Sequence, residues 1–285
     1  MRWEGNRESD NVEDRRGGGM PMLGGGRIGL GTIAVALVGW LVFDINPLTL
    51  IDAMSGGSGQ VQQAPAHKTP ADDQMARFVS VVLADTEDVW QDIFRKQGAQ
   101  YRDPRLVLFT GATPTACGTG QSAMGPFYCP ADEKVYIDLG FYQTMKTRLG
   151  APGDFAQAYV VAHEVGHHVQ NLMGISEKVQ NLRRRASEKE ANALSVRLEL
   201  QADCFAGVWA YHAQEARKIL DSGDLEEALN AASQIGDDTL QRSAGRAVVP
   251  DSFTHGSGKQ RVRWFKEGFD SGDVRQCNTF KAAQL

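Results

Sequence analysis

Two histidines and a glutamate lie within five consecutive residues of this 285-residue chain, His163-Glu164-Val165-Gly166-His167. On an α-helix, positions i and i+4 lie one turn apart on the same face, so both imidazoles can reach a single ion. Glu164 follows the first histidine and can meet a water molecule bound to that ion. This H-E-x-x-H pattern predicts a zinc hydrolase that makes its nucleophile from water.

The sequence around the pattern predicts a buried helix over about 155–173. A helix-forming run over 156–162 leads into the motif, Asp154 is a candidate N-cap, and Gly174 closes the run. Apolar residues occupy much of the circumference, which indicates burial. A chance match on an ordinary helix is the alternative. However, two histidines and a glutamate on a buried helix need partners, and a metal ion is the economical one.

A second buried helix is expected over 197–209, preceded by a capping-box pattern at 187–190. Glu199 and Asp203 lie one turn apart on it among apolar residues, where two acids are costly unless paired or bound to metal. We predict Glu199 as the third zinc ligand and Asp203 as the acceptor of a hydrogen bond from a ligand imidazole. The alternative is that both acids form ion pairs at the helix surface, for example with Arg197.

These motifs resemble a known family. The stretch 161–170 together with Glu199-Leu-Gln-Ala-Asp203 resembles the gluzincin type of metallopeptidase, in which a glutamate is the third ligand and an aspartate follows it. More closely, the chain resembles the bacterial "putative neutral zinc metallopeptidase" family. That resemblance runs from about residue 101 to the C-terminus in Cys117-Gly118, Gly125-Pro-Phe-Tyr-Cys-Pro130, Val135-Tyr-Ile-Asp-Leu139, the two ligand motifs, Ser252-Phe-Thr-His-Gly256 and Gln260-Arg-Val-Arg-Trp-Phe265. It implies a zincin-like domain with a Zn²⁺ cofactor that hydrolyses peptide or protein substrates at a membrane.

The first 75 residues divide into three expected segments. Residues 1–26 are charged and glycine-rich, which predicts a disordered tail. Residues 27–45 contain an uncharged run, somewhat short of the roughly 20 residues that span a bilayer, and we predict a single transmembrane helix there. Residues 46–75 read as a flexible linker. A cleaved signal peptide is the alternative to an uncleaved anchor.

The arginines that precede the apolar run predict the orientation of this anchor. Arg15, Arg16 and Arg27 place the N-terminus in the cytoplasm by the positive-inside rule. The domain that follows the linker would then lie outside the cytoplasm, on the periplasmic side of the bacterial inner membrane. Membrane contact is therefore expected through the N-terminal helix.

The domain over 76–285 is predicted to be α+β, mostly helical, with a small sheet. Its expected strands span 105–110 and 134–139. Its other expected helices span about 78–94, 224–235 and 258–270, the last capped by Ser257. The strand over 135–139 is a candidate edge for an extended substrate to pair with, by analogy with zincins.

All four cysteines lie in this domain. Cys117 and Cys129 flank a loop and could close it, and Cys204 could tether the C-terminal tail through Cys277. Other pairings remain open, as do free buried thiols. Even pairing agrees with an oxidising compartment outside the cytoplasm.

In the expected mechanism Glu164 is the general base, and a further side chain donates a hydrogen bond to the substrate oxygen. His255, on a loop before the last helix, is the main candidate donor, with Tyr136 and Tyr142 as weaker ones. His168 points about 100° away from His167 around the helix and is expected to pack or support rather than bind the ion.

Two other function classes stay open from the sequence. One is a zinc hydrolase of another amide bond, such as a cell-wall amidase, and the other is a non-catalytic membrane protein that retains the metal site. Glu164 argues against the second class, because metal binding alone does not require a base. A net charge of −5 and a pI near 5.7 give no support to nucleic-acid binding. The sequence leaves the oligomeric state undetermined.

Overall fold

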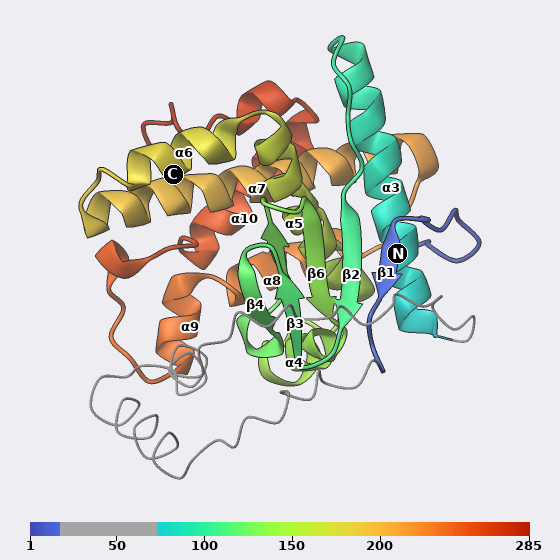
Figure 1. Cartoon of the computed structure of the whole chain (residues 1–285), viewed down its shortest axis with the longest axis horizontal. Helices are drawn as coiled ribbons and strands as arrows, with labels where there is room; N and C mark the ends of the chain where they lie inside the picture. Colours follow the sequence, from blue (N-terminus) through green and yellow to red (C-terminus); the bar gives the residue numbers. More distant parts are fainter. Residues whose placement is uncertain (18–72) are drawn as a thin grey trace. The chain divides into compact units, whose positions relative to one another are not determined.

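A four-stranded sheet in the order β1-β2-β6-β5 positions the helices in the computed structural model, which describes residues 1–17 and 73–285 (Figure 1). The first three strands are parallel and β5 runs antiparallel to β6. Their bounds are β1 (Val12–Asp14), β2 (Arg105–Phe109), β5 (Phe127–Cys129) and β6 (Lys134–Asp138). A separate hairpin joins β3 (Ala112–Thr115) to β4 (Gly118–Gln121).

The two-residue period of the strands sorts their side chains between two apolar clusters. Leu106 and Leu108 of β2 join the large core formed with the helices, whereas Val107 and Phe109 join a smaller cluster with Tyr136. Burial on both faces is the usual situation of parallel strands.

The order of the strands corrects one expectation from the sequence. The strand over 135–139 corresponds to β6, which lies between β2 and β5 and pairs with both. Its backbone groups are therefore used within the sheet. The edge strand next to β6 is β5, which could accept an added strand.

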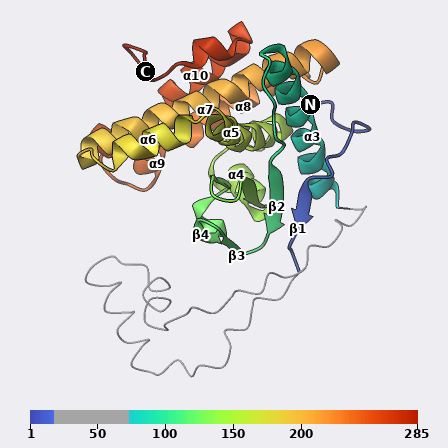
Figure 2. The ribbon, with the colours of Figure 1, turned by 45° about the horizontal axis from the view of Figure 1, so that its top comes forward.

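Eight helices of more than one turn are described in residues 73–285, and they carry most of the domain. They are α3 (Gln74–Lys96), α4 (Gly140–Arg148), α5 (Asp154–Leu172), α6 (Ile175–Arg183), α7 (Glu188–Arg217), α8 (Asp224–Gln234), α9 (Asp237–Ser243) and α10 (Gly258–Ser271). Helix α7 packs against both α5 and α10, and Figure 2 shows this long helix running past them. The two predicted ligand helices are thus neighbours in the core.

Glycines let these helices approach closely. A Cβ atom on Gly166 of α5 would lie 2.9 Å from the backbone oxygen of Ala202 in α7. A Cβ on Gly268 of α10 would lie 1.9 Å from the backbone oxygen of Cys204. Any larger side chain at either position would force the backbones apart.

Helix ends follow the sequence signals with one difference. Ser187 and Ser257 each form a capping box, and Gly174 adopts a left-handed conformation with φ of 69° after α5. Asp154, predicted as the N-cap of α5, is instead its first helical residue, behind Gly153. Its carboxylate pairs with the Met1 ammonium at 2.7 Å.

The N-terminal segment differs from its prediction, because residues 1–16 belong to the same compact unit as the helices. Strand β1 pairs in parallel with β2, with Val12 opposite Leu106. The buried Glu87 of α3 accepts hydrogen bonds from the Ser9 hydroxyl at 2.5 Å and the Asn11 amide at 2.9 Å. The polar side chains that led to the prediction of disorder form these specific long-range contacts.

The predicted transmembrane helix over 27–45 and most of the linker over 46–75 lie outside the described residues. Within 1–17 and 73–285, none of the helices has the length and apolar character needed to span a bilayer. The expected fold class is therefore corrected to a mostly helical domain with small sheets, without a transmembrane helix in the part described.

Candidate metal centre

Helices α5 and α7 bring His163, His167 and Glu199 together, with one ligand atom of each within 4.8 Å of the others. The Nε2 atom of His163 lies 3.2 Å from Glu199 Oε2, and that of His167 lies 3.5 Å from Glu199 Oε1. The i, i+4 spacing places both imidazoles on one face of α5, as the sequence predicts. The close contact of α5 and α7 at Gly166 brings Glu199 to that face.

The Nδ1 atom of His163 lies 2.8 Å from Asp203 Oδ1, and its Nε2 lies 3.2 Å from Glu199 Oε2. A neutral imidazole that donates from Nδ1 to Asp203 offers the lone pair of Nε2 to a metal ion. Asp203 is fully buried and also accepts from the Tyr159 hydroxyl at 2.5 Å. Arg261 of α10 holds both carboxylate oxygens of Asp203, through Nε and Nη2 at 2.9 Å each. Burial alone would raise the pKa of Asp203, but Arg261 and His163 lower it to about 2.

The second imidazole is oriented in the same sense by a neutral group. His167 Nδ1 donates to the side-chain oxygen of Gln170 at 2.9 Å, so its Nε2 also faces Glu199. In its neutral form, each histidine can therefore present the lone pair of Nε2 toward the same carboxylate. Three electron-pair donors in contact require either a proton or a cation between them.

This donor set fits zinc. Two imidazole nitrogens and one carboxylate oxygen are a common set of catalytic zinc ligands, and they leave a fourth position for water. Burial lowers the pKa of His163, yet the carboxylates of Asp203 and Glu199 outweigh it and raise that pKa to about 10. Without an ion these carboxylates hold a proton on the imidazole, and a divalent cation can take its place.

Glu164 lies beside the ligands and lines the same cavity. Its side chain is buried, and burial raises its pKa above the ordinary value for a glutamate. A raised pKa suits a carboxylate that first accepts a proton and then donates it.

His255 also lines this cavity, at the loop before α10. Its Nδ1 lies 3.2 Å from Asp237 Oδ1, and Asp237 Oδ2 accepts from the backbone N–H groups of Thr254, His255 and Gly256. The hydrogen bond that His255 donates to the Asp237 carboxylate raises the pKa of His255. Asp237, at the first turn of α9, thus fixes both the loop and the ring, leaving Nε2 as the nitrogen available to a substrate.

The cavity has a volume of about 1500 Å³ and reaches well beyond the three ligands. Its walls come from β5, α4, α5, α6 and the loop before α10. Apolar side chains at its rim include the exposed Met124 and Leu240. A cavity of this size can hold several residues of a chain-like substrate.

The other predicted hydrogen-bond donors lie away from the ligands. The Tyr136 hydroxyl donates to Asp132 at 2.7 Å, and Tyr142 is buried in the core of the domain. Neither lines the cavity. His168 is buried and contacts the Tyr128 hydroxyl and the backbone oxygen of Arg102, so it supports the fold and does not join the three proposed ligands.

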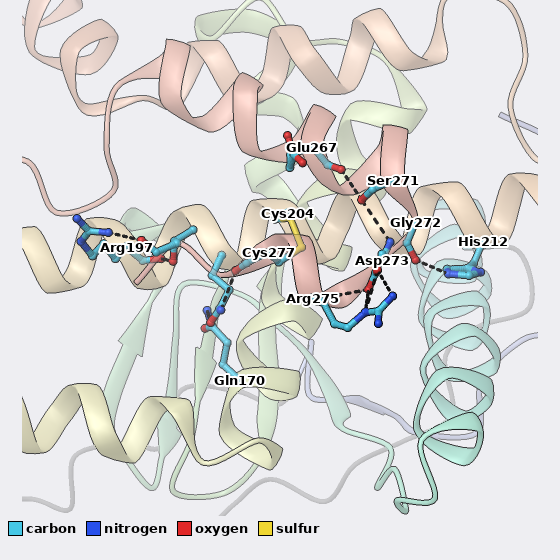
Figure 3. Close-up of a disulfide and its surroundings, with 12 residues drawn as sticks. Gln170, Arg197, Cys204, His212, Glu267, Ser271, Gly272, Asp273, Arg275 and Cys277 are labelled. Atoms are coloured by element: carbon cyan, nitrogen blue, oxygen red, sulfur yellow. Dashed lines mark hydrogen bonds and ion pairs between the residues drawn. A yellow bond between two sulfur atoms is a disulfide. The ribbon is translucent and has the colours of Figure 1, made fainter. Parts of the chain in front are cut away.

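Both cysteine pairs suggested by the sequence are disulfides in the structure, Cys117–Cys129 and Cys204–Cys277. Together they use all four cysteines of the chain. The first joins the turn of the β3–β4 hairpin to the edge strand β5. The second joins α7 to the C-terminal segment that follows α10 (Figure 3).

Sequence reasoning missed Arg261, Asp237 and Gln170. The only sequence signal for Arg261 was its place on the same helix as the apolar Trp264 and Phe265. An arginine buried at such a position needs a partner for its charge. Gln170 lies three residues after His167 and so on the same face of α5. Asp237 carries no sequence signal, because its role arises from the contact of α9 with a distant loop.

Comparison with known proteins agrees with this geometry. Residues 1–280 match the family described as "Putative neutral zinc metallopeptidase". The chain belongs to this family. The family description names zinc as the metal.

Relatives of this family member occur in distant bacteria. "Uncharacterized protein YpfJ" of Escherichia coli (strain K12) is 56% identical over 98% of this chain and 99% of its own length. "Uncharacterized protein Rv2575" of Mycobacterium tuberculosis (strain ATCC 25618 / H37Rv) is 41% identical over 73% of each chain. No solved structure matches the chain significantly.

Proposed function

We propose that the protein is a zinc-dependent endopeptidase with His163, His167 and Glu199 as the metal ligands and Glu164 as the general base. The observation that carries the proposal is the convergence of these four side chains at one wall of a large open cavity. The hydrogen bonds of Asp203 and Gln170 to the two imidazoles support the ligand assignment.

Each residue has a definite task in the proposed reaction. Bound zinc would supply a Lewis acid that polarises water and the substrate carbonyl. Glu164 accepts the proton of the attacking water and delivers it to the leaving amine, for which its raised pKa suits it. His255, held through Nδ1 by Asp237, donates from Nε2 to the oxygen of the substrate carbonyl as charge develops there.

The position of β5 supports an extended peptide as the substrate. Phe127 and Tyr128 of this edge strand line the cavity that contains the metal ligands. A peptide lying along β5 could pair with its free edge while its scissile bond lies near Glu164. We therefore place substrate pairing at β5.

The closing test uses the purified full-length protein. We expect stoichiometric zinc by metal analysis and cleavage of casein, with no release of fragments from peptidoglycan. The Glu164→Gln variant should keep its zinc and lose activity by about 10²- to 10⁴-fold, because the general base is gone. Full casein cleavage by this variant would refute the assigned base, and cleavage of peptidoglycan alone would replace the peptidase with a cell-wall amidase.

We also propose that the domain works in an oxidising compartment outside the cytoplasm. Support comes from the two disulfides, which persist in such compartments and are rare in the cytosol. Because residues 1–16 pack on the domain, the N-terminal segment would share its compartment.

A further inference from the structure

A chain of buried amides connects the metal centre to the disulfide-bonded C-terminal segment. Gln170 and Gln201 are both almost fully buried, with exposures of 0% and 5%. Gln170 Nε2 donates to Gln201 Oε1 at 3.1 Å, and Gln201 Nε2 donates to the backbone oxygen of Cys277 at 2.9 Å. Figure 3 shows Gln170 close to Cys277 and its disulfide.

The direction of these hydrogen bonds is set at the Cys277 end. A backbone carbonyl can only accept, so Gln201 must present its NH₂ group to Cys277 and its oxygen to Gln170. Gln170 must then present NH₂ to Gln201 and its own oxygen to His167 Nδ1, at 2.9 Å. The imidazole must carry its hydrogen on Nδ1, which leaves Nε2 free to bind a metal.

A second acceptor strengthens the same orientation. Gln170 Nε2 also donates to the backbone oxygen of Leu198 at 2.7 Å, one residue before Glu199. Gln170 therefore ties α5 to α7 between two proposed ligands. All of its hydrogen-bonding groups have partners, so the amide cannot turn over without leaving buried groups unpaired.

The C-terminal segment is held in a position where the backbone carbonyl of Cys277 can accept the hydrogen bond from Gln201. The Cys204–Cys277 disulfide attaches it to α7, one turn beyond Gln201. Arg197 donates to the backbone oxygen of Thr279, and the Thr279 hydroxyl donates to the backbone oxygen of Arg197 at 2.6 Å. The segment is therefore bonded to α7 at Arg197 and at Cys204, before and after Glu199 in the sequence.

We infer that Gln170 and Gln201 are positioning residues through which the disulfide-bonded C-terminal segment sets the tautomer and orientation of His167. The inference deepens the proposed function and rests on its metal site. It also explains why the two imidazoles differ, since His163 is oriented by a carboxylate that Arg261 neutralises and His167 by an uncharged amide.

Zinc affinity of the full chain, measured by chelator competition, tests this inference without relying on activity. Gln170→Met keeps the side-chain length but removes every hydrogen bond, and it should weaken zinc binding by about 10- to 100-fold. Gln201→Met leaves the contact between Gln170 and His167 and should weaken binding several-fold. Gln143→Met, at an exposed position of α4, is the matched control and should bind as the wild type does.

A spectroscopic readout separates positioning from a loss of stability. In the cobalt-substituted protein, Gln170→Met should shift the visible absorption bands of the metal, whereas a merely structural role would lower the melting temperature and leave the bands unchanged. Wild-type zinc affinity in Gln170→Met would overturn the inference. Wild-type zinc affinity in Gln201→Met would show that the C-terminal segment does not help to orient His167. Failure of the wild-type chain to bind zinc would instead count against the proposed function.

Discussion

The metal centre depends on the charge of Asp203, which is not itself a proposed ligand and forms an ion pair with Arg261. Both side chains are almost fully buried, and the pKa of Asp203, lowered to about 2, keeps the carboxylate charged at any pH near neutrality. Asp203 also holds the Tyr159 hydroxyl, so three groups converge on one carboxylate. The pair therefore supports both the fold and the imidazole of His163.

Replacing Asp203 by Asn should reveal both contributions. We expect a loss of about 3–5 kcal/mol in the free energy of unfolding, because Arg261 would remain buried without its counter-charge. Zinc affinity should also fall by about 10- to 100-fold, because His163 would lose its charged acceptor. Chemical denaturation and chelator competition measure the two effects. Asp270→Asn, which breaks an exposed ion pair with Lys266, is the control and should change neither quantity.

The pH dependence of catalysis should identify His255 and Asp237 as a working pair. Asp237 raises the pKa of His255, so the protonated imidazole that donates to substrate persists to a higher pH than the ordinary value of about 6.5 would allow. Activity that needs this proton is present below the raised pKa and is lost as the pH rises through it. Asp237→Asn should lower that pKa and move the alkaline limb of kcat/KM to lower pH.

Two comparisons make this pH experiment decisive. His255→Ala should lower kcat/KM by about 10²- to 10³-fold and abolish the limb assigned to the imidazole. Asp251→Asn, at an exposed surface ion pair with Lys189, should leave the whole profile unchanged. An alkaline limb that keeps its position in Asp237→Asn would show that another group titrates there.

At the scale of the elements, the centre depends on how closely α5 and α7 approach. Gly166→Ala replaces glycine by a better helix former, a change that favours an isolated helix by about 1 kcal/mol. In this protein the new Cβ would meet the Ala202 backbone at 2.9 Å, so the helices must separate. We expect a lower melting temperature and weaker zinc binding, measured by calorimetry and by chelator competition.

The position of Gly140 in α4 provides a comparison for this helix contact. There an added Cβ would meet the carboxylate oxygen of Asp138 at 3.2 Å, at the end of a side chain that can move. Gly140→Ala should therefore change the melting temperature less than Gly166→Ala does. An unchanged zinc affinity in Gly166→Ala would mean that Glu199 reaches the ion without the close approach of the two helices.

What the sequence predicts well are features contained within a single element. The spacing of His163 and His167, and that of Glu199 and Asp203, lies within one helix turn, and the serine caps and Gly174 mark helix ends locally. The roles of Arg261, Asp237 and β1 escaped prediction, because they exist only after packing. Arg261 acts across α10 and α7, Asp237 across α9 and a loop, and β1 is a three-residue strand whose stability comes from β2 and α3.

At the scale of the whole molecule, we predict that the N-terminal segment lies in the same compartment as the metal centre. Strand β1 pairs with β2, Ser9 and Asn11 bond to the buried Glu87, and the Met1 ammonium pairs with Asp154 at the start of α5. These contacts connect the segment to three separate elements of the domain. Separating them across a bilayer would leave Glu87 buried without its donors, which is costly.

Cysteine labelling in intact bacterial cells can test this shared compartment, because the natural cysteines are all in disulfides. Glu4→Cys and Lys281→Cys each introduce one exposed thiol, at opposite ends of the chain. Because both ends belong to one packed unit, a membrane-impermeant maleimide should treat the two variants alike, before and after lysis. Labelling of Lys281→Cys in intact cells, with Glu4→Cys reacting only after lysis, would show that a membrane separates the ends and that β1 does not pair with β2 in the cell.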